Sequence, residues 1–124
     1  MTIVCVDDYS LALDGLTKSI QSILPDARIC SFKSSDEASE FVKDNGCDVL
    51  FTEIEMRGGG GLVLAKNVQK LNPKVNIIFL TVCDAKEHAS EVFNIRPSGY
   101  LLKPATKDQL AYELNNLRYV PCVG

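Results

Sequence analysis

Val49-Leu50-Phe51-Thr52-Glu53 is the stretch that decides the fold, because four residues typical of a buried strand end abruptly in a carboxylate. Other apolar runs, near residues 2–7, 27–32, 76–81 and 99–102, surround it. Three of these runs also lead into reactive or polar side chains. The run near 2–7 leads into Asp7-Asp8, the run near 76–81 ends in Thr81, and the run near 99–102 leads into Lys103-Pro104. Runs that stay apolar without alternation are typical of strands buried on both faces of a parallel sheet.

Segments with helical periodicity separate these runs. Apolar residues recur at steps of three and four over residues 13–23 and 64–71, and again after residue 106. A helix is predicted over 85–94, with Ala85, Ala89, Val92 and Phe93 facing inward. Ser34–Glu37 and Thr106–Gln109 match the capping-box pattern that begins helices. The chain therefore reads as β-α five times, which predicts an α/β domain with a five-stranded parallel sheet of order 2-1-3-4-5, the flavodoxin-like (βα)5 fold.

Composition excludes several classes. The 124 residues suffice for one core, and 46% hydrophobic with 23% charged residues is ordinary for a globular domain. The net charge of −3 gives no reason to expect nucleic-acid binding by this domain. No apolar run approaches the ~20 residues that span a bilayer, and the N-terminus lacks signal-peptide features, so a cytoplasmic protein without membrane contact is the default. The five cysteines lack metal-ligand spacing, and only Cys83 is a candidate for reactivity.

The ends of the runs predict a cluster. Ligands bind at the carboxyl ends of strands in an open parallel sheet, so Asp7, Asp8, Glu53, Thr81 and Lys103 should gather at one edge. Three carboxylates repel one another, and a hard divalent cation such as Mg²⁺ and the Lys103 ammonium group would relieve that repulsion. A cation, an amine and a hydroxyl around a central carboxylate suit the binding of phosphoryl oxygens.

Four motifs then occur in a familiar order. An acidic pair follows the first strand, a glycine-rich stretch from Glu53 to Gly61 follows the third, Thr81 ends the fourth, and Tyr100 stands three residues before Lys103-Pro104. With these motifs, the chain resembles the receiver domains of two-component response regulators over nearly its whole length. Residues 77–81 and 98–104 are similar to receivers joined to DNA-binding output domains in Gram-positive transcriptional regulators.

The resemblance implies a metal site. Asp8 would bind Mg²⁺ (or Mn²⁺) directly and Asp7 through water. Glu53, at the phosphoacceptor position, and the backbone carbonyl of Glu55 would complete the protein's ligands. In the family, the metal supports transfer of a phosphoryl group to the acceptor carboxylate.

The resemblance also implies a switch. Lys103 and Thr81 would bind phosphoryl oxygens, Tyr100 would move from exposed to buried, and Pro104 would follow a cis peptide bond. The resulting two-state change would alter the face formed by the fourth helix, fifth strand and fifth helix, which includes His88 and Val92. That face is the expected site of homodimer formation and readout.

The expected organisation is a receiver domain at residues 1–119, followed by a C-terminal tail or the start of a linker at 120–124. A sensor histidine kinase would be its partner, and a DNA-binding output domain would follow in a longer transcriptional regulator. The domain would not be an enzyme beyond phosphorylation of itself.

Glu53 departs from the family, which has Asp at this position. Its extra methylene advances the carboxylate by ~1.5 Å, and a displacement of that size can cost ~100-fold in an in-line transfer. Glu53 can also place about one negative charge where a phosphorylated Asp carries nearly two. An inert strand cap, a partial phosphorylation mimic, an engineered Asp-to-Glu change and residual phosphorylation all remain open. Arg57, where the family has Pro, and the glycines after it predict a mobile loop.

Rival interpretations are weaker. A metal-dependent phosphohydrolase of the same architecture would keep an Asp nucleophile and add a cap, for which no length remains. A flavin-binding module would need a hydroxyl-rich loop where Asp7 and Asp8 stand. A P-loop is excluded because the glycine run lacks a Gly-Lys-Ser/Thr ending. Thr81 can also be a core hydroxyl, and His88 a solvated helix residue rather than a catalyst.

Overall fold

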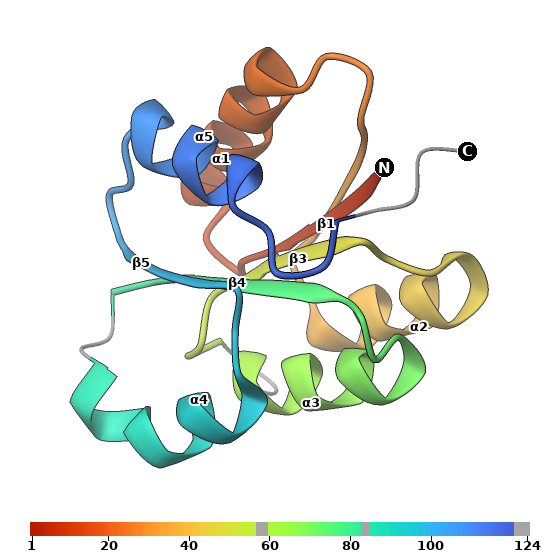
Figure 1. The fold of residues 1–124 in the computed structure, drawn as a ribbon, viewed down its shortest axis with the longest axis vertical. Helices are drawn as coiled ribbons and strands as arrows, with labels where there is room; N and C mark the ends of the chain where they lie inside the picture. The colour runs from red at the N-terminus through yellow and green to blue at the C-terminus, as the bar shows by residue number, and fades with distance from the viewer. Residues whose placement is uncertain (57–59, 83–84, 121–124) are drawn as a thin grey trace.

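The five apolar runs form one parallel sheet in the order β2-β1-β3-β4-β5 (Figure 1). The computed structural model describes residues 1–56, 60–82 and 85–120, without the side chains of residues 85 and 86. The strands are Thr2–Val6 (β1), Arg28–Phe32 (β2), Val49–Thr52 (β3), Asn76–Thr81 (β4) and Gly99–Leu102 (β5). The predicted fold class and strand order are confirmed.

Helices cover both faces of the sheet, with α1 and α5 on one side and α2, α3 and α4 on the other (Figure 1). They are Ser10–Ile23 (α1), Ser35–Asn45 (α2), Gly61–Leu71 (α3), Ala89–Ile95 (α4) and Lys107–Asn115 (α5), and a 3₁₀ turn at Ala85–His88 (η1) precedes α4. None of these helices is long and apolar enough to cross a membrane. Alternation along β1 supplies two separate cores, since Ile3 and Cys5 pack toward α1 and α5 while Val4 and Val6 pack toward α2 and α3.

The helix starts follow local sequence signals. The Thr106 hydroxyl accepts from the Gln109 backbone N–H at 3.1 Å, and the Gln109 side chain accepts from the Thr106 N–H at 2.9 Å. This reciprocal pair is the predicted capping box. Ser34 caps α2 by accepting from the Glu37 N–H. Both caps satisfy backbone donors that the first helical turn leaves without partners.

The prediction for residues 85–94 is wrong about which side chains face the core. Residues 85–88 form a 3₁₀ turn, and Phe93 is 76% exposed. Ala89 is also exposed, whereas Ile95 is buried and Val92 packs partly against the core. The physical reason is the number of residues per turn, which is 3.0 in a 3₁₀ helix and 3.6 in an α-helix. Because the segment changes from one to the other at Ala89, the apolar side of α4 lies at a different angle from the one expected for a continuous α-helix. The Ala85 side chain lies outside the described residues.

Gly61 brings the start of α3 against the loop that follows β3. Its N–H donates to the Ile54 carbonyl at 2.7 Å, and a Cβ added at this position would overlap the Glu53 carbonyl oxygen. A glycine is therefore required here by close backbone approach. The loop predicted to be mobile, from Arg57 onward, lies outside the described residues as far as residue 59, as does Cys83.

Replacing Gly61 by Ala should destabilise the domain by about 1–3 kcal/mol, because the new methyl group must displace the Glu53 backbone. Gly15→Ala is the matched control, since a Cβ there has no neighbour within 4 Å and Ala favours a helix interior by about 1 kcal/mol. Urea denaturation should lower the midpoint for Gly61→Ala and hold or raise it for Gly15→Ala. Equal midpoints for the two variants would contradict the close approach.

Candidate functional site

The ends of three central strands and β5 bring the predicted polar residues together. The register pairs Val6 with Thr52, and the Glu53 N–H extends this pairing by donating to the Val6 carbonyl at 3.1 Å. The Lys103 N–H donates in the same way to the Thr81 carbonyl at 2.8 Å. Parallel pairing thus carries these side chains to a common edge of the sheet.

Glu53 lies at the centre of the cluster and is only 4% exposed. Its Oε1 accepts from the Ile54 backbone N–H at 2.8 Å and from the Thr81 hydroxyl. Its Oε2 pairs with Lys103 Nζ at 2.8 Å. Both oxygens of this buried carboxylate therefore already have donors, as a buried charge requires.

Lys103 joins Glu53 to Asp7. Its ammonium group is ion-paired with Asp7 Oδ2 as well as with Glu53, and its side chain is 16% exposed. The other oxygen of Asp7, Oδ1, accepts from the Tyr9 backbone N–H at 2.9 Å. Asp8, the next residue in the chain, is half-buried. One ammonium group thus lies between two buried carboxylates, and the Lys103–Pro104 peptide that carries it is cis, as predicted.

The pKa of Lys103 reflects this environment. Burial by itself lowers the pKa, but hydrogen bonds to Asp7 and Glu53 and the negative charges of both carboxylates raise it by more. The net pKa is above the ordinary value of 10.5. Lys103 is therefore charged at neutral pH, and its positive charge holds the two carboxylates together.

Of the predicted switch residues, Thr81 belongs to the cluster and Tyr100 lies on the neighbouring strand β5. Thr81 is fully buried, with its hydroxyl directed at Glu53. Tyr100 is half-buried against the core under α4, and its ring centroid is 6.1 Å from that of Phe79, its partner in the β4–β5 pairing. Thr81 and Tyr100 therefore lie on adjacent strands that lead from the buried charges to the surface beside α4.

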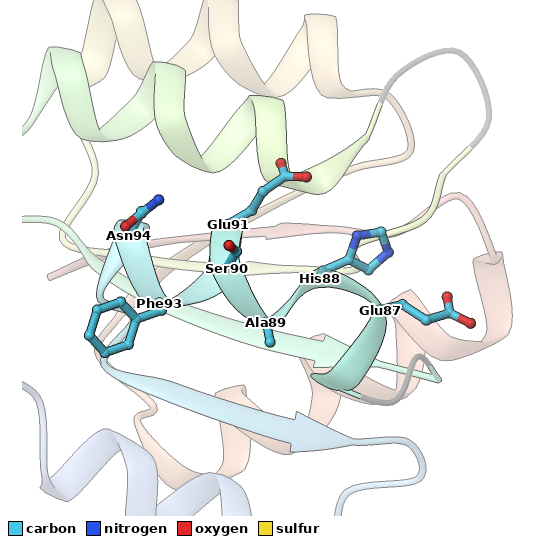
Figure 2. A pocket seen from close by; sticks show the side chains of 7 residues that line it. All are labelled: Glu87, His88, Ala89, Ser90, Glu91, Phe93 and Asn94. Carbon is cyan, nitrogen blue, oxygen red and sulfur yellow. The ribbon is translucent and has the colours of Figure 1, made fainter.

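Glu55 and His88 lie to one side of the cluster. The Glu55 carboxylate is exposed and lies 3.4 Å from His88 Nε2, and Glu87 completes a group with ligand atoms within 4.8 Å of one another. Figure 2 shows Glu87 and His88 at one end of a shallow hollow on the outer side of η1 and α4, with Phe93 and Asn94 at the other end. The contact between His88 and Glu55 at the surface accounts for this grouping without a ligand.

The predicted metal ligands have the chemistry of a hard-cation site. Asp7 and Glu53 present carboxylate oxygens around Lys103, Asp8 follows Asp7 in the chain, and oxygen is the ligand that Mg²⁺ prefers. Within the described residues, however, the acidic and histidine side chains whose ligand atoms lie within 4.8 Å of one another are Glu55, Glu87 and His88, not Asp7, Asp8 and Glu53. Lys103 already contacts Asp7 and Glu53, so a metal would share these carboxylates with the ammonium group. The role of the Glu55 carbonyl remains a prediction.

Sequence reasoning missed the backbone donors. The N–H groups of Ile54 and Tyr9 each satisfy a carboxylate oxygen of the cluster, and every residue except Pro carries such a group. Gly61 was also missed as a packing requirement, because the glycine run was interpreted as a source of mobility. The position of Gly61 at the end of that run, just before the helical periodicity of residues 64–71, was the available signal.

The sequence matches the family described as response regulator receiver domain over residues 3–115. Among curated proteins, it is 29% identical to Protein MrkE of Klebsiella pneumoniae over 94% of this chain and 43% of that protein. It is 28% identical to the transcriptional regulatory protein YpdB of Escherichia coli K12, over 94% of this chain and 47% of that protein. It is 25% identical to the sensory transduction protein LytT of Bacillus subtilis, over 97% of this chain and 49% of that protein. The chain thus spans less than half the length of these relatives.

Solved structures share the fold. A response regulator receiver domain protein from Clostridium thermocellum has a TM-score of 0.82 at 24% identity, covering 93% of this chain and 91% of that one. RcsB from Salmonella enterica serovar Typhimurium, solved bound to promoter rprA in the presence of phosphomimetic BeF3-, has a TM-score of 0.79 at 26% identity, covering 98% and 70%.

Removing the ammonium group tests the electrostatic account. Lys103→Met leaves two buried carboxylates without their shared cation, which should destabilise the domain by about 2–3 kcal/mol, somewhat below the ~3–5 kcal/mol of a fully buried pair because Lys103 is partly exposed. Lys66→Met, which removes an exposed pair with Glu91, should cost at most about 1 kcal/mol. Mg²⁺ should recover part of the loss in Lys103→Met only.

The pH dependence has a definite sign. Because the folded pKa of Lys103 is raised, its stabilising contribution is fully present below the unfolded value of 10.5 and is lost as pH rises through the folded pKa. The gap in unfolding free energy between the parent protein and Lys103→Met should therefore stay constant from about pH 7 to 9 and shrink only above the unfolded value. If this difference in unfolding free energy disappears below pH 9, Asp7 and Glu53 do not stabilise the charged form of Lys103.

Proposed function

The chain belongs to the response regulator receiver domain family, and from this premise we propose that it is a receiver whose switch is held by the Glu53 carboxylate instead of by a phosphorylated Asp. It would act as the signal-receiving part of a longer two-component transcriptional regulator. Usual phosphorylation at residue 53 would be impaired, and the charge of Glu53 would take over part of its effect.

One observation carries this proposal. The Glu53 carboxylate itself binds the Thr81 hydroxyl and the Lys103 ammonium group. These are the two side chains to which the family resemblance assigns phosphoryl oxygens. A carboxylate that already satisfies both supports an internally completed site. With about one charge in place of nearly two, it would shift the switch less than a phosphoryl group does.

The same contacts argue against phosphorylation. The attacking oxygen needs a lone pair directed at the phosphodonor, and three donors already occupy lone pairs of the two Glu53 oxygens. Its extra methylene also moves the carboxylate ~1.5 Å from the position an Asp would occupy, which can cost ~100-fold. Both effects lower the rate of transfer, since phosphoryl transfer depends chiefly on positioning.

Asp7, Asp8, Glu53 and the backbone carbonyl of Glu55 would hold Mg²⁺ or Mn²⁺. When bound, the metal would neutralise charge on the carboxylates and on a phosphodonor. In its absence Lys103 serves the first purpose, because it pairs with Asp7 and Glu53 together. The site thus has a fixed protein cation beside the proposed metal ligands.

The readout surface would be the face formed by α4, β5 and α5. Phe93 on α4, Leu102 on β5 and Tyr112 on α5 are 76%, 56% and 65% exposed, an apolar set that suits contact with a second copy. Tyr100, half-buried beside them, would link this face to Thr81. A homodimer through this face would be favoured when Glu53 holds Thr81.

A sensor histidine kinase would be the ancestral partner, and an output domain of the DNA-binding kind would follow this domain in a cytoplasmic regulator. The curated relatives support the output domain, since several are transcriptional regulators about twice as long as this chain. A direct contact of this domain with nucleic acid is not proposed, because the net charge is −3.

Glu53→Asp should restore phosphorylation. Incubated with Mg²⁺ and acetyl phosphate, the Asp variant should gain the mass of one phosphoryl group by intact-protein mass spectrometry, while the parent protein gains none. If neither protein gains this mass, Asp7, Asp8, Thr81 and Lys103 do not support the transfer of a phosphoryl group to residue 53. Sustained hydrolysis of a generic phosphate ester by the parent would instead favour an enzyme.

Glu53→Gln should release the switch, because a neutral amide loses the ion pair with Lys103. Backbone NMR shifts should then change at Thr81, Tyr100 and residues 89–95. Glu40→Gln, an exposed position on α2, is the matched control and should leave α4 unchanged. Shift changes confined to the immediate neighbours of residue 53 would mean that Glu53 is an inert strand cap.

A further inference from the structure

The described chain does not leave the domain freely after α5. Figure 1 shows it passing from α5 back across the sheet, and residues 118 and 119 hydrogen-bond to the edge opposite the Glu53 cluster. This is the amino-terminal edge, because Asn76 begins β4 while Thr81 ends it. Nothing in the cluster or the proposed switch requires such an attachment.

Asn76 forms the first half of the attachment. Its side chain is 1% exposed, and its Nδ2 donates to the Tyr119 carbonyl at 2.7 Å and to the Asp48 carbonyl at 3.1 Å. Its Oδ1 accepts from the Tyr119 N–H at 2.8 Å. One buried amide thus pairs with both backbone groups of Tyr119, as a neighbouring strand would. Without Tyr119, Asn76 would lose two of these bonds in a buried position, which is costly.

Arg118 forms the second half. Its backbone N–H donates to Ser98 Oγ at 3.2 Å, and its guanidinium group donates to the Arg96 carbonyl at 2.7 Å and to the Pro97 carbonyl at 3.5 Å. Arg96 is the C-cap of α4 in the left-handed conformation, with φ of 57°. A planar guanidinium group is suited to bridge two carbonyls, and its charge is favourable at a helix C-terminus.

We propose that Asn76, Ser98 and the Arg96–Pro97 turn form an intramolecular docking site for the segment that begins at Arg118. The site fixes where the chain leaves the domain and attaches that exit to the C-terminal end of α4. A domain following residue 120 would then have a defined position relative to α4 and would not be joined through a flexible linker that begins directly after α5. The docking site does not depend on the state of Glu53, so it stands or fails separately from the proposed function.

The test is amide hydrogen exchange on the 124-residue protein. The Arg118 and Tyr119 amides should be protected in the parent protein, and Arg118→Ala should speed their exchange about tenfold or more. Arg118→Lys should fall between the two, since Lys keeps the charge but cannot bridge both carbonyls. Lys107→Ala, an exposed cation in the first turn of α5, is the matched control and should leave both amides unchanged.

A second variant separates docking from folding. Ser98→Ala removes only the acceptor of the Arg118 N–H, so the melting temperature should stay near that of the parent protein while exchange at Arg118 rises. Exchange of both amides at the rate of an unprotected chain in the parent would overturn the proposal. So would unchanged exchange at residues 118 and 119 in Arg118→Ala with the fold intact.

Discussion

The pairing of Lys103 with Asp7 and Glu53 is the interaction on which the carboxyl edge of the sheet depends. Strands β1, β3 and β4 bring Asp7, Glu53 and Thr81 to that edge. Strand β5 brings Lys103, whose ammonium group pairs with both carboxylates. Parallel pairing makes the convergence unavoidable, because successive strands end on the same side. Without the ammonium group, the buried carboxylates would repel one another, and the close packing of Gly61 beneath Glu53 would hold them in that unfavourable position.

Glu53 is the residue on which the proposed function depends. With Asp at this position, the carboxylate would end one methylene short of its present place, which leaves space for a phosphoryl group between it and the donors. Glu53 instead places its own oxygens against Thr81 and Lys103. Under the proposed function, a smaller and permanent charge would replace a phosphoryl group that is added and removed. The chain belongs to the receiver family, and under the proposed function the extra methylene of Glu53 would hinder transfer from an external phosphodonor.

Much of the fold could be predicted because it depends on local signals. Continuous apolar runs gave the strands, capping residues such as Thr106 gave helix starts, and the strand ends gave the grouping of Asp7, Glu53, Thr81 and Lys103. The facing of α4 could not be predicted, since the 3₁₀ turn before Ala89 shifts the apolar stripe and no sequence signal marks that turn. The backbone donors and the attachment of Tyr119 to Asn76 were equally hidden, because such contacts depend on tertiary approach and not on residue type.

The two ends of α4 are held differently, and this bears on how the proposed switch would move. At the C-terminal end, Gln69 of α3 donates to the Ile95 carbonyl at 2.7 Å, and Arg118 holds the carbonyls of the next two residues. At the other end, two contacts between side chains are present: Glu91 in the first turn of α4 pairs with Lys66 of α3 at 3.3 Å, and His88 of η1 lies 3.4 Å from the Glu55 carboxylate. Exposed pairs of this kind contribute at most about 1 kcal/mol, so the N-terminal end of α4 is held less firmly than the C-terminal end. The charge at residue 53 would therefore act on the N-terminal end of α4, while the docked exit of the chain keeps its place.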